Sequence, residues 1–299
     1  MSPIDYSDMQ NALAGLLNEN AFVERATLTR SIFGRKIPLI TLGKGKRAVL
    51  YVGAHHGTEG VTTGVLLDFI ADYLHQYANH ATVFEYPMEY LFRERKIYIV
   101  PMLNPDGVEY ATHGVEKENP LLERLLLMNG GSDDFSRWNA NARGVDLNHN
   151  YDAEFEKYKE SEIAEGIVNG APNGYSGEFP ESEPETAALC RFLRSRREEI
   201  CGVLSLHTRG EEILCSCADN LTAKTMAAGR ILSRFTGYRL ARPEGISARG
   251  SLSDWCISSL LRPAYTLRCG KGEGVLLFGE QSKIYERLRR ALFSFPFLI

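Results

Sequence analysis

Short apolar runs that alternate with helical periodicity constrain this chain more than any other feature of its sequence. The run Arg47–Ala54 (RAVLYVGA) predicts a buried strand, and Val61–Tyr77 follows it with apolar residues at helical spacing. Three further apolar runs predict central strands: Lys96–Met102, Cys201–Leu206 and Ala264–Cys269. Strands that alternate with helices favour an α/β fold, here a three-layer α/β/α sandwich around a mixed, mainly parallel twisted sheet.

Local signals place several other elements. Residues 26–33 and 36–43 alternate polar and apolar side chains around Gly34-Arg35, which predicts a two-stranded hairpin. Ser182–Arg197 begins with a typical helix start, and Glu280–Phe293 also has a helical pattern. Asn104-Pro105-Asp106-Gly107 is a turn signal directly after a predicted strand.

Composition excludes several classes of protein. The 34 Lys and Arg and 38 Asp and Glu residues give a formal charge of −4 without long blocks, so we expect no nucleic-acid partner. No apolar run approaches the ~20 residues that span a bilayer, and the first residues lack a secretory pattern, so we expect no membrane association. Six cysteines are too few for a disulfide scaffold and indicate buried thiols in a reducing compartment, so we expect a cytoplasmic location.

Candidate metal ligands follow two of the predicted strands. His56 and Glu59 form a His-x-x-Glu pair just after the first strand, and His207 follows Cys201–Leu206. Two imidazoles and one carboxylate leave a fourth position open for water, which is typical of a catalytic zinc. A Glu that stabilises the start of a helix is the alternative explanation of Glu59.

Four more motifs occur in an order that identifies a family resemblance. They are Asn104–Gly107, Arg143–Asn150 (RGVDLNHN), Ser205–Thr208 (SLHT) and Gly250–Trp255 (GSLSDW). Together with His-x-x-Glu they resemble the M14 zinc carboxypeptidases, and most of all the bacterial branch that includes γ-D-glutamyl-meso-diaminopimelate peptidases. The resemblance implies a zinc carboxypeptidase-like catalytic domain over residues 26–299, preceded by a lead-in segment over residues 1–25.

The resemblance also implies roles for individual residues. His56, Glu59 and His207 match the ligands of one zinc ion per chain, and Asp146 matches the residue that orients the first zinc histidine. A metal-bound histidine needs such an acceptor on its other ring nitrogen, although Asp146 also suits a turn. Asn148 matches the Asn of an Asn-Arg pair that holds the substrate carboxylate. His149 replaces the Arg of that pair, so a bidentate clamp is missing there, and nearby Arg143 is either a substitute or a surface residue.

The largest departure from the family lies at its general base. The family ends its last core strand with Thr-x-Glu, whereas this chain has Arg268 in the Glu position. Strand alternation places Arg268 on the same face as Thr266, toward the metal, but an Arg does not accept a proton at neutral pH. Glu273 and Glu211 or Glu212 are candidate substitutes, each with a solvated loop carboxylate as the alternative. Arg209 adds a second cation, and two arginines in one zinc cleft favour an anionic ligand.

These observations predict a zinc metallopeptidase of the M14 type that hydrolyses a short peptide with carboxylate groups. A cell-wall fragment with γ-D-Glu and diaminopimelate is the expected substrate class. Two alternatives remain. Arg268 favours a pseudopeptidase that binds zinc and peptide without efficient turnover. The ligand pattern is shared by zinc amidohydrolases of the aspartoacylase or desuccinylase type, although Asn-Pro-Asp-Gly and Gly-Val-Asp-Leu-Asn favour a peptidase.

Overall fold

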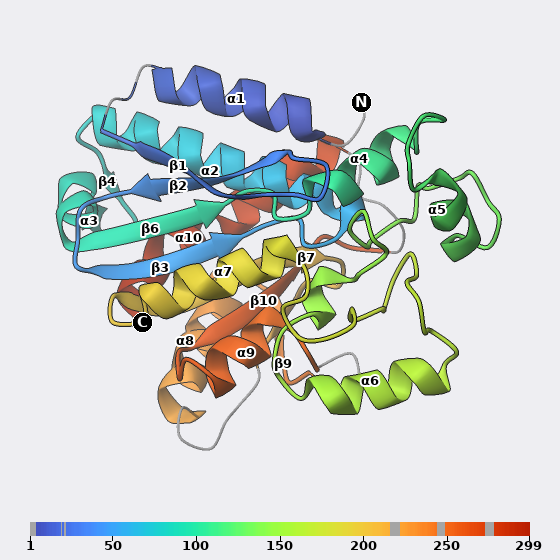
Figure 1. The fold of residues 1–299 in the computed structure, drawn as a ribbon. Helices are drawn as coiled ribbons and strands as arrows, with labels where there is room; N and C mark the ends of the chain where they lie inside the picture. Colours follow the sequence, from blue (N-terminus) through green and yellow to red (C-terminus); the bar gives the residue numbers. More distant parts are fainter. Residues whose placement is uncertain (1–3, 19, 21, 216–221, 244–248, 273–277) are drawn as a thin grey trace.

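An eight-stranded mixed sheet forms the middle layer of the fold (Figure 1). The computed structural model describes residues 4–18, 20, 22–215, 222–243, 249–272 and 278–299. In spatial order the strands are β1 (Glu24–Arg30), β2 (Lys36–Leu42), β6 (Arg95–Val100), β3 (Arg47–Val52), β7 (Ile200–Thr208), β10 (Ala264–Cys269), β8 (Glu212–Leu214) and β9 (Arg239–Ala241). A separate small sheet pairs β4 (Thr82–Val83) with β5 (Tyr86–Pro87).

The centre of the sheet is parallel. Strands β6, β3, β7 and β10 run in the same direction, whereas β1, β2 and β8 join through antiparallel pairs. In register, Val52 faces Ser205 and Arg268 faces His207. Because the carboxyl ends of parallel strands meet at one edge of a sheet, the residues after β3, β7 and β10 come together there.

Helices cover both faces of the sheet (Figure 1). Their bounds are α1 (Tyr6–Asn18), α2 (Gly60–Ala78), α3 (Met88–Glu94), α4 (Pro105–His113), α5 (Leu122–Met128), α6 (Phe155–Ala164), α7 (Pro184–Ser195), α8 (Thr222–Thr236), α9 (Leu252–Ser258) and α10 (Gln281–Leu298). Short 3₁₀ helices are η1 (Gly57–Glu59), η2 (Leu147–His149) and η4 (Phe278–Glu280).

Side-chain alternation divides the core into two layers. Leu206 and Leu267 belong to an apolar cluster with residues of α2, α8 and α10. Leu50 and Val203 point to the other face, into a cluster with residues of α7 and α9. Successive strand residues point to opposite faces, so both layers are built from the same strands. The predicted α/β/α sandwich is confirmed.

The predicted elements agree with the structure within a few residues, with one difference. Asn104–Gly107 starts a helix rather than forming an isolated turn. Asn104 caps α4 by accepting a hydrogen bond from the backbone amide of Gly107 at 2.9 Å, and Pro105 occupies the first helical position. Both residue types favour a helix start as well as a turn, so the local sequence does not separate the two. The domain boundary at residues 25 and 26 stays a prediction; α1, which precedes it, lies against α2.

Two expectations from composition concern membrane association and the cysteines. No helix among the described residues combines the length and the apolar character that a membrane span requires. Cys190, Cys201, Cys256 and Cys269 are free thiols, and Cys217 lies outside the described residues.

Candidate metal centre

The turn after β3 carries two of the predicted ligands. The chain leaves the sheet at His55, passes through η1 and enters α2, so that His56 and Glu59 lie on one turn. Gly57 makes this path possible, because a Cβ there would lie 2.3 Å from the carbonyl oxygens of Gly107 and Trp138. His207 comes from the end of β7, the neighbouring strand.

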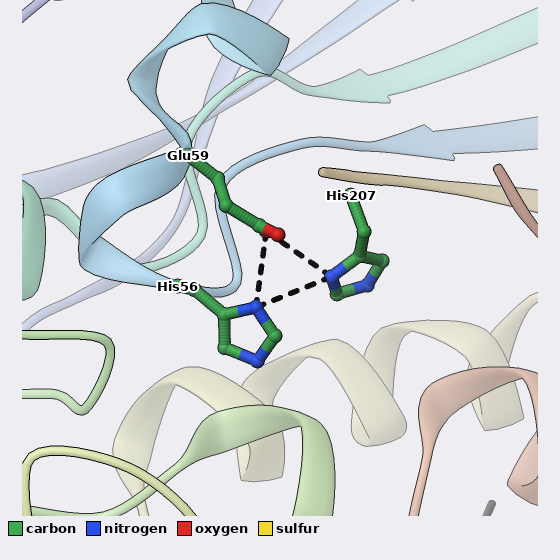
Figure 2. Close-up of side chains that lie close together, drawn as sticks. All are labelled: His56, Glu59 and His207. Carbon is green, nitrogen blue, oxygen red and sulfur yellow. Dashed lines mark hydrogen bonds and ion pairs between the residues drawn. The ribbon is translucent and has the colours of Figure 1, made fainter. Parts of the chain in front are cut away.

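The three predicted ligands meet with their donor atoms together (Figure 2). Glu59 Oε2 lies 3.1 Å from Nδ1 of His56 and 3.1 Å from Nδ1 of His207, and these two nitrogens are 3.4 Å apart. Ligands at about 2.0–2.1 Å around a tetrahedral zinc lie about 3.3 Å from one another, so the spacing suits this metal.

The hydrogen bonds of Glu59 also fit a metal ligand. Its Oε1 accepts a hydrogen bond from the backbone amide of Thr208 at 2.8 Å, which fixes the carboxylate. Its Oε2 is buried and forms no well-aligned hydrogen bond. Buried carboxylate oxygens normally have partners, so this oxygen between two imidazole nitrogens suits a cation. Burial raises the pKa of Glu59, but the charges of His56 and His207 outweigh it and keep the pKa well below its usual value.

Each histidine has a partner on its other ring nitrogen. Nε2 of His56 lies 3.1 Å from Oδ1 of Asp146, and Nε2 of His207 lies 2.9 Å from Oγ of Ser205. Asp146 is itself fixed, because its oxygens accept hydrogen bonds from the backbone amides of Asn148 and Gly174, each at 3.1 Å. Although burial lowers the pKa of His56, the carboxylates of Glu59 and Asp146 raise it well above its ordinary value. The site therefore favours positive charge, which a metal or a proton supplies.

A cleft of about 770 Å³ opens beside these ligands. His56 and Glu59 line it, together with Arg209 and Arg268. The other described lining residues are Thr58, Ser136, Arg137, Asn139, Thr208, Gly210 and Gly272. Among the described residues of the cleft, Glu59 is the only carboxylate, whereas three are arginines. Long-range attraction in this cleft therefore favours anions.

Arg268 lies where strand alternation predicts. It faces the cleft at the end of β10, beside His207, with its side chain 45% exposed. Its Nη1 is 3.3 Å from Oε2 of Glu212, which also pairs with Arg239. Arg209 also lines the cleft and donates a hydrogen bond from Nη1 to the carbonyl of Lys271 at 2.8 Å.

The remaining candidates lie elsewhere. Asn148, His149 and Arg143 are not among the described residues that line the cleft. His149 donates from Nδ1 to the carbonyl of Arg249 at 2.8 Å and stacks on Tyr158, while Asn148 accepts a hydrogen bond from the Leu252 amide at 3.4 Å. Arg143 is 48% exposed, with Nη1 3.8 Å from Oε1 of Glu183. Their predicted contact with substrate stays a prediction.

The sequence predicts three candidate bases. Glu212 pairs with Arg268 and Arg239 and is not among the described residues that line the cleft. Glu211 turns away from the metal ligands and pairs with Arg287 of α10 at 2.6 Å, which accounts for its absence from the described cleft lining. Glu273 lies outside the described residues.

Sequence reasoning missed two features of the site. Arg137 and Asn139 line the cleft from a long loop, where no periodicity indicates which way a side chain points. His55 lies fully buried behind the ligands, and its Nε2 is 2.9 Å from the hydroxyl of Tyr151. Burial, with smaller effects of His207 and His56, keeps the pKa of His55 well below its ordinary value, so this imidazole is neutral. The adjacent pair His55-His56 could have indicated this buried imidazole. Neighbouring side chains point in different directions, so only one of the two histidines reaches the metal position.

Comparison with known proteins agrees with this geometry. The chain belongs to the zinc carboxypeptidase family, M14, whose model matches residues 10–287. It is therefore a member of a zinc-dependent metallopeptidase family, and the predicted resemblance is confirmed.

Particular relatives refine the placement within the family. The chain is 30% identical to gamma-D-glutamyl-L-diamino acid endopeptidase 1 of Lysinibacillus sphaericus, over 94% of this chain and 69% of the relative. It is 29% identical to the uncharacterized protein YqgT of Bacillus subtilis, over 97% of this chain and 77% of the relative.

Solved structures support the fold. Thrombin activatable fibrinolysis inhibitor superposes with a TM-score of 0.72 at 16% identity, over 97% of this chain and 73% of that chain. The murein-tripeptide amidase MpaA of Escherichia coli O157 superposes with a TM-score of 0.52 at 19% identity, over 91% and 90% of the two chains.

Proposed function

We propose that this protein binds one zinc ion through His56, Glu59 and His207 and hydrolyses an amide bond in a short anionic peptide. The observation that carries the proposal is the meeting of two imidazole nitrogens with Oε2 of Glu59, a buried oxygen without a well-aligned hydrogen bond, at the edge of a cleft. A zinc ion there supplies an activated water and polarises the scissile carbonyl. The chain orients the site, since Asp146 and the Thr208 amide fix the ligands.

The charge of the cleft supports an anionic substrate. Arg137, Arg209 and Arg268 line it, and Glu59 is the only carboxylate among its described lining residues. Guanidinium groups bind carboxylates in a bidentate geometry, and exclusion of water strengthens such contacts. A peptide with several carboxylates suits this surface. The relative that acts as a gamma-D-glutamyl-L-diamino acid endopeptidase supports a murein peptide with γ-D-Glu and diaminopimelate as the substrate.

A second candidate function is peptide binding without efficient turnover, and Arg268 favours it. The described part of the cleft offers no carboxylate besides Glu59 to accept a proton from the metal-bound water. General acid–base assistance contributes about 10²–10⁴-fold, so its loss leaves slow hydrolysis or none. In both functions Arg268 holds a carboxylate of the ligand, in competition with Glu212.

The test is turnover of a tripeptide that contains γ-D-Glu-diaminopimelate by the zinc-loaded protein, with products identified by mass spectrometry. We expect cleavage that is lost in His207→Ala and retained in His75→Ala, a matched change of an exposed histidine on α2. Binding in calorimetry without cleavage supports the second candidate. Hydrolysis of N-acyl amino acids instead of the peptide indicates an amidohydrolase. If the protein neither binds nor cleaves any of these compounds, the proposal is contradicted.

A further inference from the structure

A row of buried polar groups extends from His207 into the core, away from the cleft. Nε2 of His207 lies 2.9 Å from Oγ of Ser205, and this oxygen lies 3.4 Å from Nδ1 of His55. Nε2 of His55 in turn lies 2.9 Å from the hydroxyl of Tyr151. Ser205, His55 and Tyr151 are fully buried, so water does not compete for these contacts. We refer to Ser205, His55 and Tyr151 as the buried chain.

The sheet itself holds the buried chain in place. Ser205 precedes His207 by two residues on β7, so both side chains lie on the same face of the strand. His55 follows β3, the neighbouring strand, and its ring stacks on that of His207 with centroids 5.0 Å apart. Tyr151 approaches His55 from the segment after η2. Because two paired strands set these positions, the groups keep their neighbours and only their protons can rearrange.

When Ser205 donates its hydroxyl proton within the buried chain, proton counting allows two directions. A neutral imidazole carries one proton, on either ring nitrogen, and each hydroxyl donates one hydrogen bond. In the outward direction His207 Nε2–H donates to Ser205, Ser205 donates to Nδ1 of His55, and His55 Nε2–H donates to Tyr151. In the inward direction Tyr151 donates to His55, His55 donates to Ser205, and Ser205 donates to Nε2 of His207.

Only the outward direction permits a metal. Nδ1 of His207 faces Glu59 and His56, and a nitrogen that binds a metal carries no proton. The inward direction leaves the proton of His207 on Nδ1, inside the metal position. Each imidazole and each hydroxyl keeps one proton in both directions. The reversal therefore moves a proton within each ring and turns the two hydroxyls without a change in net charge, and the buried protons exchange with solvent when the core opens transiently.

The two directions differ in how well they satisfy Tyr151. Among the described residues its hydroxyl hydrogen-bonds to His55 alone. In the inward direction the hydroxyl of Tyr151 donates its proton to His55, whereas in the outward direction this proton has no acceptor. A buried donor without an acceptor costs free energy. The metal-free protein therefore favours the inward direction, and metal binding reverses it.

From this geometry we infer that Ser205, His55 and Tyr151 are positioning residues whose hydrogen-bond direction selects the tautomer of His207 and is reversed by zinc. The inference rests on the proposed zinc site. Ser205 holds the ring of His207 against rotation in the metal-bound state, and Tyr151 opposes that state. The buried chain thus adjusts zinc affinity from groups that touch neither the metal nor the substrate.

The direct test is the tautomer of His55 in the wild-type protein, read by nitrogen NMR with labelled histidine. We expect the proton on Nδ1 without metal and on Nε2 after addition of one equivalent of zinc. An identical His55 tautomer in both states overturns the inference while the zinc site stands. A wild type that binds no zinc overturns the proposed function, and with it the metal dependence of the buried chain.

Zinc competition against a chromophoric chelator provides the second test. We expect Ser205→Ala to weaken zinc binding by about 10–100-fold, because a metal-bound ring is a stronger donor and loses its acceptor. Tyr151→Phe should tighten binding, by roughly tenfold, because it removes the donor that favours the inward direction. The matched control is Ser253→Ala, which removes a buried hydroxyl pair with Thr266 at 2.8 Å outside the buried chain. Equal zinc affinity of Ser205→Ala and Ser253→Ala, or weaker binding in Tyr151→Phe, contradicts the inference.

Discussion

Replacement of Glu185 by Gln should change the pH dependence of stability in a defined way. Glu185 lies in the first turn of α7, is fully buried, and has no well-aligned hydrogen bond to either carboxyl oxygen. Burial, reinforced by the nearby charges of Glu183 and Asp106, raises its pKa from 4.5 to about 8, although its backbone amide and Asn141 oppose this shift. The folded protein therefore holds a proton that the unfolded chain releases above pH 4.5.

The sign and size of the pH dependence of stability follow from the difference in protons bound by the folded and unfolded states. Because the native state binds more protons between pH 4.5 and about 8, the wild type loses stability as pH rises through this window, by about 1.4 kcal/mol per pH unit. The whole shift corresponds to roughly 5 kcal/mol above pH 8, an upper bound because local opening admits water. Glu185→Gln removes the ionisation, and its unpartnered amide adds a penalty of about 1–3 kcal/mol at every pH.

Urea unfolding of wild type and variant at intervals from pH 4 to pH 9 measures the effect. We expect the stability of Glu185→Gln relative to wild type to rise across the window and to be constant on either side. Leu193→Ala, a non-titrating buried change on the same helix, is the control and should lower stability by about 2–5 kcal/mol equally at every pH. A Glu185→Gln difference that is flat with pH would refute the reasoning, since it would mean that Glu185 ionises in the folded state as in the unfolded state.

Three further predictions concern the site. Metal analysis of the zinc-treated protein should find about one zinc per chain, and none at micromolar zinc in His207→Ala, because removal of one of three ligands leaves no site; zinc retained by the variant contradicts the assignment. Asp146→Asn should weaken zinc affinity by about 10–100-fold in a chelator competition, because it removes the anionic partner of His56; an unchanged affinity makes Asp146 a turn residue. Arg268→Glu should raise peptide hydrolysis, by up to about 10²-fold relative to Arg268→Gln, and most when Glu212→Gln removes the neighbouring negative charge. Equal rates in the Glu and Gln variants would show that no base acts there, and a sharply raised KM would identify Arg268 as a clamp for a substrate carboxylate.

The sequence predicts the centre of the fold better than its loops, for a physical reason. Apolar runs and strand alternation determine which way a side chain points, so the directions of Thr266 and Arg268 follow from the sequence. The same logic brings His56 and His207 to one edge of a parallel sheet. Loop residues obey no such period. His149 lies against Tyr158 and Glu211 pairs with Arg287, and only tertiary contacts decide these orientations.

The sequence also fails to predict the cleft-lining loop and the short edge strands. Arg137 precedes a motif but belongs to no periodic segment, and β8 and β9 have only three residues each. Such short segments carry too few side chains to show alternation. Asn104 illustrates a different limit, since a turn and a helix start share the same residue preferences.

The pairing of β3 with β7 has a consequence for how this protein acquires the proposed zinc ion. His56 and His207 are separated by 151 residues of chain, and they meet because distant strands pair in the middle of the sheet. Non-local pairing of this kind forms slowly, because a long loop must close before the contacts reward it. A partly folded chain therefore offers His56 and Glu59 as a weak local pair, without the third ligand. Uptake of the ion thus waits for closure of the central sheet, so the metal selects chains whose folding is complete.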